Sequence, residues 1–232
     1  MNREISGLSS MATRPILAEL SERIRLAHGI PVRFEAAGGV ETERRVREGT
    51  VADLLVLADG AMAALEKDGH LLTGTVRPLW ISQVVAAVPE GTSVPALGSE
   101  SDLRAAILSA RKIAYSTGPS GTALVDLIHR LDLTDTLGDR LVQAAPGVPV
   151  GSLLSSGQAD LAFQQHSELM GLPGVVVVGP LPGDTAINSI FSAGVLASSI
   201  QPTRAREVLD LLGSDTATRA ARARGMRTPR DE

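Results

Sequence analysis

Short apolar runs that are typical of strands alternate along this chain with apolar-periodic segments that are typical of helices. Residues 53–57 (DLLVL), for example, have the pattern of a strand buried on both faces. Because a parallel pair of strands needs a helical crossover between them, this alternation predicts an α/β fold with a largely parallel sheet. Two long apolar stretches, at residues 76–88 and 188–197, bracket the middle of the chain.

The simplest topology that uses both long stretches has two α/β lobes joined by two crossover strands. We expect residues 1–80 and 190–232 to form lobe 1, and residues 81–189 to form lobe 2. A ligand is then expected in a cleft between the lobes, at the carboxyl ends of the strands. A single doubly wound sheet is the alternative that the pattern leaves open.

Composition excludes several kinds of chemistry. The chain has 232 residues, a net charge of −4 and basic residues that stay dispersed until the last twenty positions, which argues against nucleic acid as a partner. It has no cysteine, so thiol catalysis, disulfides and cysteine-ligated zinc are excluded. The four histidines lack the spacing of metal ligands. We therefore expect no metal site.

The start of the chain bears on its location. The first ten residues contain no apolar segment of signal-peptide length, and no apolar run in the sequence is long enough to cross a membrane. We expect a cytoplasmic protein without a membrane span, or a periplasmic or cell-surface protein if a leader has been removed. An ABC permease is a partner only in the exported case.

The stretch Tyr115–Gly121 (YSTGPSG) has the features of an anion-binding loop. It follows a short apolar run and opens an apolar-periodic segment at Thr122. Glycine lets the backbone approach a ligand closely, and the N–H groups and dipole at a helix start favour negative charge. An ordinary capped turn between a strand and a helix has a similar sequence, so this loop alone does not decide the matter.

Similar loops follow other predicted strands. Together with the loop at Tyr115–Gly121, three loops offer serine hydroxyls or glycine N–H groups at a helix start, with no carboxylate in the turn, which suits a small oxyanion or carboxylate. Two glutamines follow a further strand: either Gln165 donates into the cleft while Gln164 packs or supports the loop, or one of the two faces solvent. The residues that we expect to bind the ligand from these loops are Ser9, Ser10, Met11, Gly38, Gly39, Ser116, Gly118, Ser120, Gly121, Gln164 and Gln165.

Charged and titratable side chains near the predicted cleft are fewer. Arg77 precedes the first crossover and is a candidate bidentate clamp for a ligand carboxylate, and Ser82 lies within that crossover. The arginines of residues 44–47 are expected to form a solvated face with the glutamates beside them. His166 is the histidine nearest the predicted cleft, although a solvent-facing position is the simpler interpretation.

Five motifs carry a resemblance to a known family. They are LSSMA near the N-terminus, AGGV after the second strand, YSTGPSG in the middle, PGVPVGSL, and FQQHSELM. Together they resemble the type 2 periplasmic binding proteins, and within these the molybdate-binding-protein-like group, from about Ile5 to Gly225.

This resemblance implies two α/β lobes that close over a ligand. The residues of this chain that match the family's ligand-binding positions are Ser10, Gly39, Ser116 to Ser120, Val148 through its backbone, and Gln165. The chain departs from the molybdate binders at two of these positions. A glycine pair, Gly38 and Gly39, stands where they usually carry a serine, and Gln165 stands where they carry a tyrosine. These departures imply a roomier site, shaped for an organic acid.

The sequence also resembles aconitate isomerase, an enzyme built on this fold that interconverts cis- and trans-aconitate by an allylic proton shift without a cofactor. That resemblance implies a proton-accepting group, for which His166 and Glu168 have suitable chemistry. The first hypothesis is therefore an aconitate-isomerase-like enzyme that acts on a small tricarboxylic acid. The second is a solute-binding protein of an ABC transporter for molybdate, another oxyanion or a small carboxylate.

Overall fold

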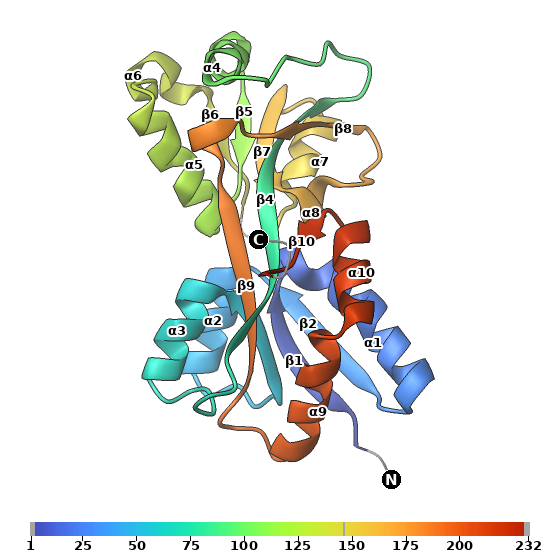
Figure 1. The fold of residues 1–232 in the computed structure, drawn as a ribbon. Helices are drawn as coiled ribbons and strands as arrows, with labels where there is room; N and C mark the ends of the chain where they lie inside the picture. Colours follow the sequence, from blue (N-terminus) through green and yellow to red (C-terminus); the bar gives the residue numbers. More distant parts are fainter. Residues whose placement is uncertain (1–2, 146, 230–232) are drawn as a thin grey trace. The chain divides into compact units, whose positions relative to one another are not determined.

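The computed structural model describes residues 3–145 and 147–229 (Figure 1). The chain divides into two compact units. The first unit contains the chain up to Ser82 and again from Ile190, and the second contains Gln83–Ser189. The chain passes from the first unit to the second within strand β4 (Arg77–Pro89) and returns within strand β9 (Asn188–Val195).

A mixed sheet with helices on both faces forms the first unit. Strand β1 lies between β2 and β3 and is parallel to both, and β9 runs antiparallel to β3. The short C-terminal strand β10 pairs with β4. Besides parts of β4 and β9, the elements of this unit are β1 (Ile5–Ser10), η1 (Met11–Thr13), α1 (Arg14–His28), β2 (Val32–Ala37), α2 (Gly39–Arg47), β3 (Leu54–Ala58), α3 (Asp59–Lys67), α9 (Pro202–Leu212), α10 (Asp215–Ala223) and β10 (Met226–Arg227).

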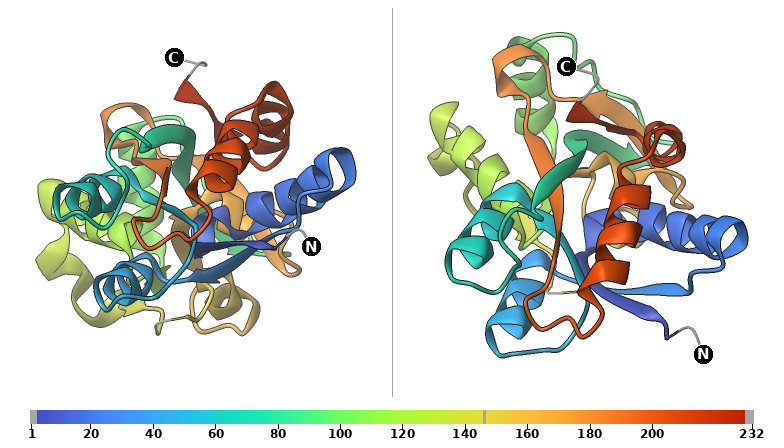
Figure 2. Two further views of the ribbon diagram at one scale, coloured as in Figure 1. Left: turned by 90° about the horizontal axis from the view of Figure 1, so that it is seen from below. Right: turned by 60° about the horizontal axis from the view of Figure 1, so that its bottom comes forward.

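Strand β3 shows why this unit carries helices on both faces of its sheet. Leu54 and Val56 point into one core, with residues of α1, α9 and α10, whereas Leu55 and Leu57 point into the other, with residues of α2 and α3. Side chains alternate between the two faces of a strand, so a continuous apolar run needs a cover on each side. Figure 2 shows α9 and α10 on the same side of the sheet as α1.

The second unit repeats this arrangement with a shorter sheet. Strand β5 lies between β6 and β7 and is parallel to both, while β4 runs antiparallel to β7 and to β8. The elements of this unit, besides β4, are α4 (Glu100–Ser109), β5 (Ile113–Tyr115), α5 (Pro119–Arg130), α6 (Thr134–Leu137), η2 (Gly138–Arg140), β6 (Leu141–Gln143), α7 (Val150–Ser155), β7 (Leu161–Gln165), α8 (His166–Leu169), β8 (Val175–Pro180) and η3 (Gly183–Thr185).

Alternation along β4 divides the core of the second unit in the same way. Val84 and Ala86 pack with residues of α4 and α5, and Val85 and Ala87 pack with residues of α7. The carboxyl ends of β5, β6 and β7 lie at one edge of this sheet because these strands are parallel. In each unit, therefore, the loops that the sequence singled out follow strands whose carboxyl ends share an edge.

The structure corrects the sequence analysis at the end of β7. Gln164 and Gln165 are the last two residues of this strand and are buried, although we expected them in the loop after it. His166 and Glu168 lie in the short helix α8, which begins directly after the strand. A strand that ends in amides and a helix of one turn carry too few apolar residues for periodicity to identify them.

Candidate functional site

The loop between β5 and α5 in the second unit has the properties expected of an anion-binding loop. Helix α5 begins with Pro119 after the N-cap Gly118, and a first turn of this kind leaves N–H groups without helical partners. In the described part of the chain, no backbone carbonyl accepts a hydrogen bond from the N–H of Gly118 or of Ser120. These two donors at the positive end of a helix dipole are available to an anion.

A chain of hydrogen bonds joins this loop to the end of β7. The hydroxyl oxygens of Ser116 and Ser120 lie 3.1 Å apart. Ser120 Oγ donates to Gln164 Oε1 over 3.1 Å, and the backbone N–H of Gln165 donates to the same oxygen over 3.0 Å. The Gln164 side chain, at the end of β7, therefore supports the loop that follows the neighbouring strand β5, as one of our sequence-based hypotheses stated.

Two residues predicted to bind the ligand have other roles in this loop region. The N–H of Gly121 is donated to Gly118 O, and a Cβ at Gly121 would meet Ser116 O at 1.9 Å, so glycine is needed there for the loop to pack. The N–H of Val148 is donated to Ala145 O within its own turn. The Val148 N–H is thus used within the protein, and ligand binding through the Val148 backbone stays a prediction; Pro146 of the same motif lies outside the described residues.

Gln165 is almost fully buried, with 3% of its surface exposed. Its Nε2 donates to Ser189 Oγ over 2.6 Å, and its Oε1 is buried without a hydrogen-bond partner among the described residues. A buried amide oxygen without a donor costs about 1–3 kcal/mol, so such an atom calls for an explanation. A ligand that supplies the missing hydrogen bond would provide one.

The two candidate proton carriers both lie on α8. Glu168 is half-buried, and burial of its carboxyl raises its pKa to about 7. A carboxyl of this kind is present in both protonation states near neutral pH, which is what general acid–base chemistry requires. His166 is also half-buried, and its carbonyl accepts the N–H of Met170.

In the first unit, the end of β1 carries the serines that the sequence analysis selected. Ser9 lies in the strand and is fully buried, and its hydroxyl has no partner within the described residues. Ser10 is the last residue of the strand, and its Oγ lies 3.5 Å from Thr13 Oγ1, which itself donates to Ser10 O. Because the Thr13 proton is used by Ser10 O, Ser10 Oγ is the donor in this long contact between the two hydroxyls. Met11 follows Ser10 in η1 and is half-buried.

The glycine pair at the start of α2 leaves space. Gly38 is the N-cap of this helix, and a Cβ added to Gly38 or to Gly39 would meet no atom within 4 Å. The φ of Gly38, −56°, is one that any residue adopts. Since neither backbone geometry nor packing demands glycine here, the absent side chains leave room beside the N–H groups of α2 for a bulky ligand.

The sequence analysis missed Asp59, at the end of the third parallel strand. Asp59 begins α3 directly after β3, and its Oδ1 accepts a hydrogen bond of 2.5 Å from Ser192 Oγ of β9. The signal was present in the sequence, because an Asp-Gly pair follows the apolar run of residues 53–57. This edge of the first unit therefore combines neutral donors with one exposed carboxylate.

Arg77 lies away from these loops. It is the first residue of β4, five positions before Ser82, and thus about 16 Å along an extended strand from the point where the chain leaves the first unit. Its Nη2 forms an ion pair of 2.8 Å with Asp210 of α9. We therefore do not include Arg77 in the site. Ser82 is fully buried, and its Oγ has no partner among the residues described.

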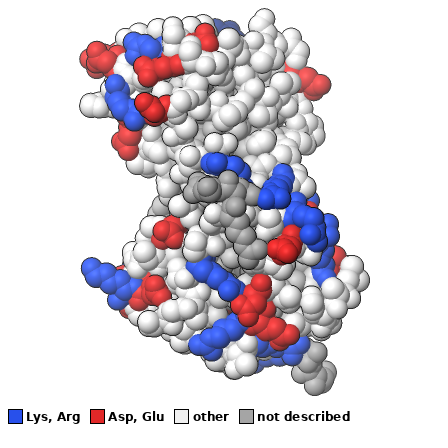
Figure 3. Space-filling model, viewed as in Figure 1, with Lys and Arg blue, Asp and Glu red and all other residues white. Residues whose placement is uncertain are grey.

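The arginines of α2 form the solvated face that the sequence predicted. Arg44 pairs with Glu41 and Glu48, Arg45 with Glu35, and Arg47 with Glu43 and Asp68. On the face shown in Figure 3, acidic and basic side chains likewise lie next to one another over the first unit. These arginines are neutralised by their neighbours and are not available as ligand clamps.

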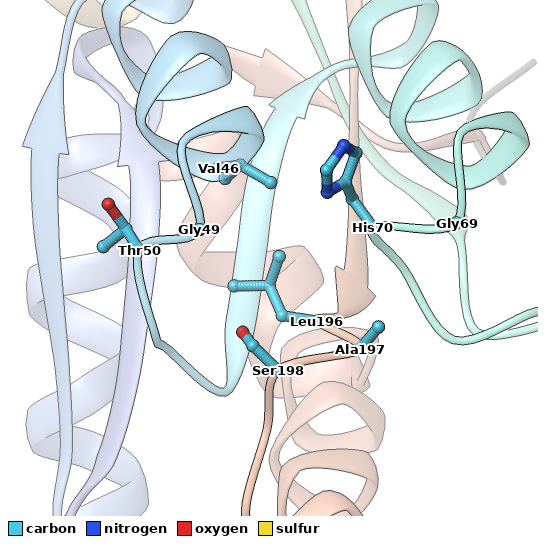
Figure 4. A pocket seen from close by; sticks show the side chains of 8 residues that line it. All are labelled: Val46, Gly49, Thr50, Gly69, His70, Leu196, Ala197 and Ser198. Atoms are coloured by element: carbon cyan, nitrogen blue, oxygen red, sulfur yellow. The ribbon is translucent and has the colours of Figure 1, made fainter.

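A surface pocket in the first unit lies elsewhere (Figure 4). Gly49 and Thr50 follow the end of α2, Gly69 and His70 follow the end of α3, and the side chains of Val46 and Leu196 line the space between them. Carbonyl groups at helix C-termini carry partial negative charge, so this pocket does not suit an anion. Within the described residues, no group of three His, Asp or Glu side chains is placed to hold a metal ion.

The chain matches the model of a family described as bacterial extracellular solute-binding proteins over residues 5–227. It therefore belongs to that family. Among curated proteins it is similar to an aconitate isomerase from a Pseudomonas species, with 26% identity over 228 residues that cover 95% of this chain and 86% of the relative.

Solved structures agree with this assignment. The periplasmic molybdate-binding protein of Azotobacter vinelandii is 19% identical and superposes with a TM-score of 0.82 over 97% of this chain and 99% of its own. The sulfate-binding protein of Mycobacterium tuberculosis is 17% identical, with a TM-score of 0.79 over 97% and 87% of the two chains. The predicted two-lobed α/β fold of type 2 periplasmic binding proteins is thus confirmed. None of the helices in the described residues is long and apolar enough to span a membrane.

Proposed function

We propose that this protein is an aconitate-isomerase-like enzyme, which moves a proton and a double bond within a small tricarboxylate. The observation that carries the proposal is the pair of free N–H donors of Gly118 and Ser120 at the start of α5, in a loop that hydrogen bonds of Ser116 and Gln164 support. Such donors stabilise a carboxylate without adding a counter-charge. The similarity to an aconitate isomerase along 95% of the chain favours a tricarboxylate over other anions.

In the first unit, we propose that Ser10 and the N–H groups of Gly38 and Gly39 also bind carboxylate groups. The open space beside the two glycines suits a branched organic acid better than a compact tetrahedral oxyanion. The carboxylate of Asp59 on the same edge disfavours ligands whose negative charge is concentrated on one small group.

The proposed chemistry uses Glu168 as the base. Its carboxylate takes a proton from the methylene carbon of aconitate, and the electron pair of that C–H bond shifts into the adjacent double bond and carboxylate. The N–H groups of Gly118 and Ser120 stabilise the resulting aci-carboxylate. A proton, from Glu168 or from His166, then returns to the other end of the three-carbon system. One C–H bond breaks and one forms, and no group is oxidised or reduced.

A solute-binding protein for molybdate, another oxyanion or a small carboxylate is the second candidate. The family membership and the likeness to molybdate- and sulfate-binding structures favour it. Under that function the protein is exported and works with an ABC permease, whereas the isomerase needs neither. A cytoplasmic location for the enzyme stays a prediction.

One experiment separates the two functions. The protein is incubated with trans-aconitate in heavy water, and formation of cis-aconitate and deuterium incorporation at the methylene carbon are followed by NMR. The isomerase predicts turnover with deuterium exchange, at a rate that rises with pH through about 7 as Glu168 ionises. Glu168→Gln should abolish turnover, whereas Glu90→Gln, which changes an exposed carboxylate of the same unit, should not. Tight stabilisation by molybdate without turnover or exchange contradicts it.

A further inference from the structure

The direction of the hydrogen bonds in the second unit limits what kind of ligand fits there. A backbone N–H can only donate, so the atom of Gln164 that receives the Gln165 N–H is the amide oxygen. Ser120 Oγ, 3.1 Å from the same oxygen, must therefore donate its only proton to it. The remaining hydrogen bond of Ser120, with Ser116 at 3.1 Å, then uses the proton of Ser116.

This order leaves Ser116 as an acceptor. Its hydroxyl proton points at Ser120, and its lone pairs are the part of the group that remains for a ligand. If Ser116 turned its proton toward an anion, its oxygen and that of Ser120 would face each other at 3.1 Å without a proton between them. Turning the Ser116 proton toward a ligand would therefore lose the hydrogen bond between Ser116 and Ser120.

Gln165 leads independently to the same conclusion. Its Nε2 is used by Ser189, and the atom that remains without a partner is again an acceptor, Oε1, in a side chain that is 3% exposed. Spare lone pairs thus occur at Gln165, the last residue of β7, and at Ser116, which follows the neighbouring strand β5 in the same loop as the N–H donors of α5. Donors and acceptors side by side match a carboxylic acid group, which carries both.

We propose that the second unit binds its ligand as a partly protonated polycarboxylate, with the ligand's own O–H donated to Ser116 Oγ and its carbonyl oxygen held by the N–H groups of Gly118 and Ser120. This inference rests on the proposed function and specifies the form in which the substrate binds. Fully deprotonated inorganic oxyanions lack the O–H and are disfavoured. Gln165 Oε1 adds a second position at which a ligand donor, and not an acceptor, is accommodated.

Other titratable groups near this position have to be separated from the ligand's proton. Tyr115 precedes Ser116 on β5, and His166 and Glu168 follow β7 on α8. On α5 itself, Asp126, His129 and Arg130 lie toward the other end of the helix, and Lys112 precedes β5 at the opposite edge of the sheet. Glu168 in particular titrates near neutral pH, so a proton bound with the ligand has to be measured without it.

The test is calorimetric. Propane-1,2,3-tricarboxylate, which lacks the double bond and cannot react, is titrated into the protein at pH 8 in buffers of different ionisation enthalpy. We expect close to one proton to be taken up per ligand, in the wild type and equally in Glu168→Gln and His166→Gln. Ser116→Ala should bind about tenfold more weakly and take up no proton. Thr122→Ala, an exposed change in the first turn of α5, should behave as wild type.

The outcomes are distinguishable. Binding of the tricarboxylate without proton uptake, or uptake that disappears in Glu168→Gln and persists in Ser116→Ala, overturns this inference while leaving the isomerase intact. Molybdate binding at pH 8 that is tighter than tricarboxylate binding overturns it as well. Failure of the protein to bind either propane-1,2,3-tricarboxylate or trans-aconitate overturns the proposed function itself.

Discussion

Replacing Glu168 with glutamine tests the environment of this carboxyl apart from any activity. Burial raises its pKa from the ordinary 4.5 to about 7, so the folded protein holds this proton more tightly than the unfolded chain does. Stability contributed by the protonated group is therefore fully present below about pH 4.5 and is lost as the pH rises through 7. Each pKa unit corresponds to ~1.4 kcal/mol, which limits the loss to about 3 kcal/mol at pH 8.

Glutamine has a similar shape and no ionisation, so the variant should lack this pH dependence. As the pH rises from 5 to 8, we expect the free energy of unfolding of Glu168→Gln to increase by about 3 kcal/mol relative to that of the wild type, which corresponds to about 6–10 °C in Tm. Urea unfolding is followed by far-UV circular dichroism, and the fluorescence of Trp80, the single tryptophan, reports the first unit separately. Glu90→Gln serves as the exposed control.

Parallel stability curves for wild type and Glu168→Gln from pH 5 to pH 8 would refute the reasoning. They would mean that water reaches the carboxyl in solution, which would also remove the physical reason for choosing Glu168 as the base. A difference confined to the transition of the second unit, with an unchanged first unit, is the result that the structure predicts.

Four further substitutions test the hydrogen bonds and the packing inside the two units. Asp53→Asn should lower the free energy of unfolding by about 2–4 kcal/mol at pH 7, measured by urea unfolding, because Asp53 accepts several buried hydrogen bonds. Burial opposes ionisation of this carboxyl, but the hydrogen bonds outweigh burial and lower its pKa, so the stability of the wild type should fall in acid below about pH 4. A variant whose stability changes with pH in parallel with the wild type would contradict this. Gly7→Ala places a Cβ 2.2 Å from the ring of Phe34 and should lower stability by about 1–3 kcal/mol, whereas an unchanged Tm would show that the ring moves freely. Gly121→Ala should destabilise the second unit more than Gly118→Ala, which meets no atom closer than 4.0 Å, and equal losses would refute the packing argument.

Sequence patterns predicted the long elements well because burial on both faces leaves a strong signal. Helix α1 begins at Arg14, where the sequence Thr13-Arg14-Pro15 is typical of a helix start, and ends at His28, before Gly29, whose φ of 65° favours glycine. The run of residues 53–57 became β3. Short elements such as β6 and α8 escaped prediction, since a few residues do not establish a period.

The site was predicted less completely, because residue type alone does not fix where hydrogen bonds go. Ser116 and Ser120 were selected as neutral donors, but the structure joins them in an order that only the position of Gln164 determines. Arg77 was selected for its charge, which a residue distant in sequence, Asp210, neutralises. Asp59 was not predicted, because a carboxylate in a turn argues against an anion site. Such pairings depend on tertiary contacts and leave no local pattern.

The two passages of the chain between the units have a consequence for biosynthesis. Everything that the second unit needs is contiguous, from Gln83 to Ser189, so the ribosome has delivered all of it before the first unit receives β9 and the helices that cover β1. Until then, one face of the nascent parallel sheet lacks its α9 and α10 cover. The inserted unit is thus able to fold early, whereas the first unit stays incomplete until the segment from β9 to α10 has been translated.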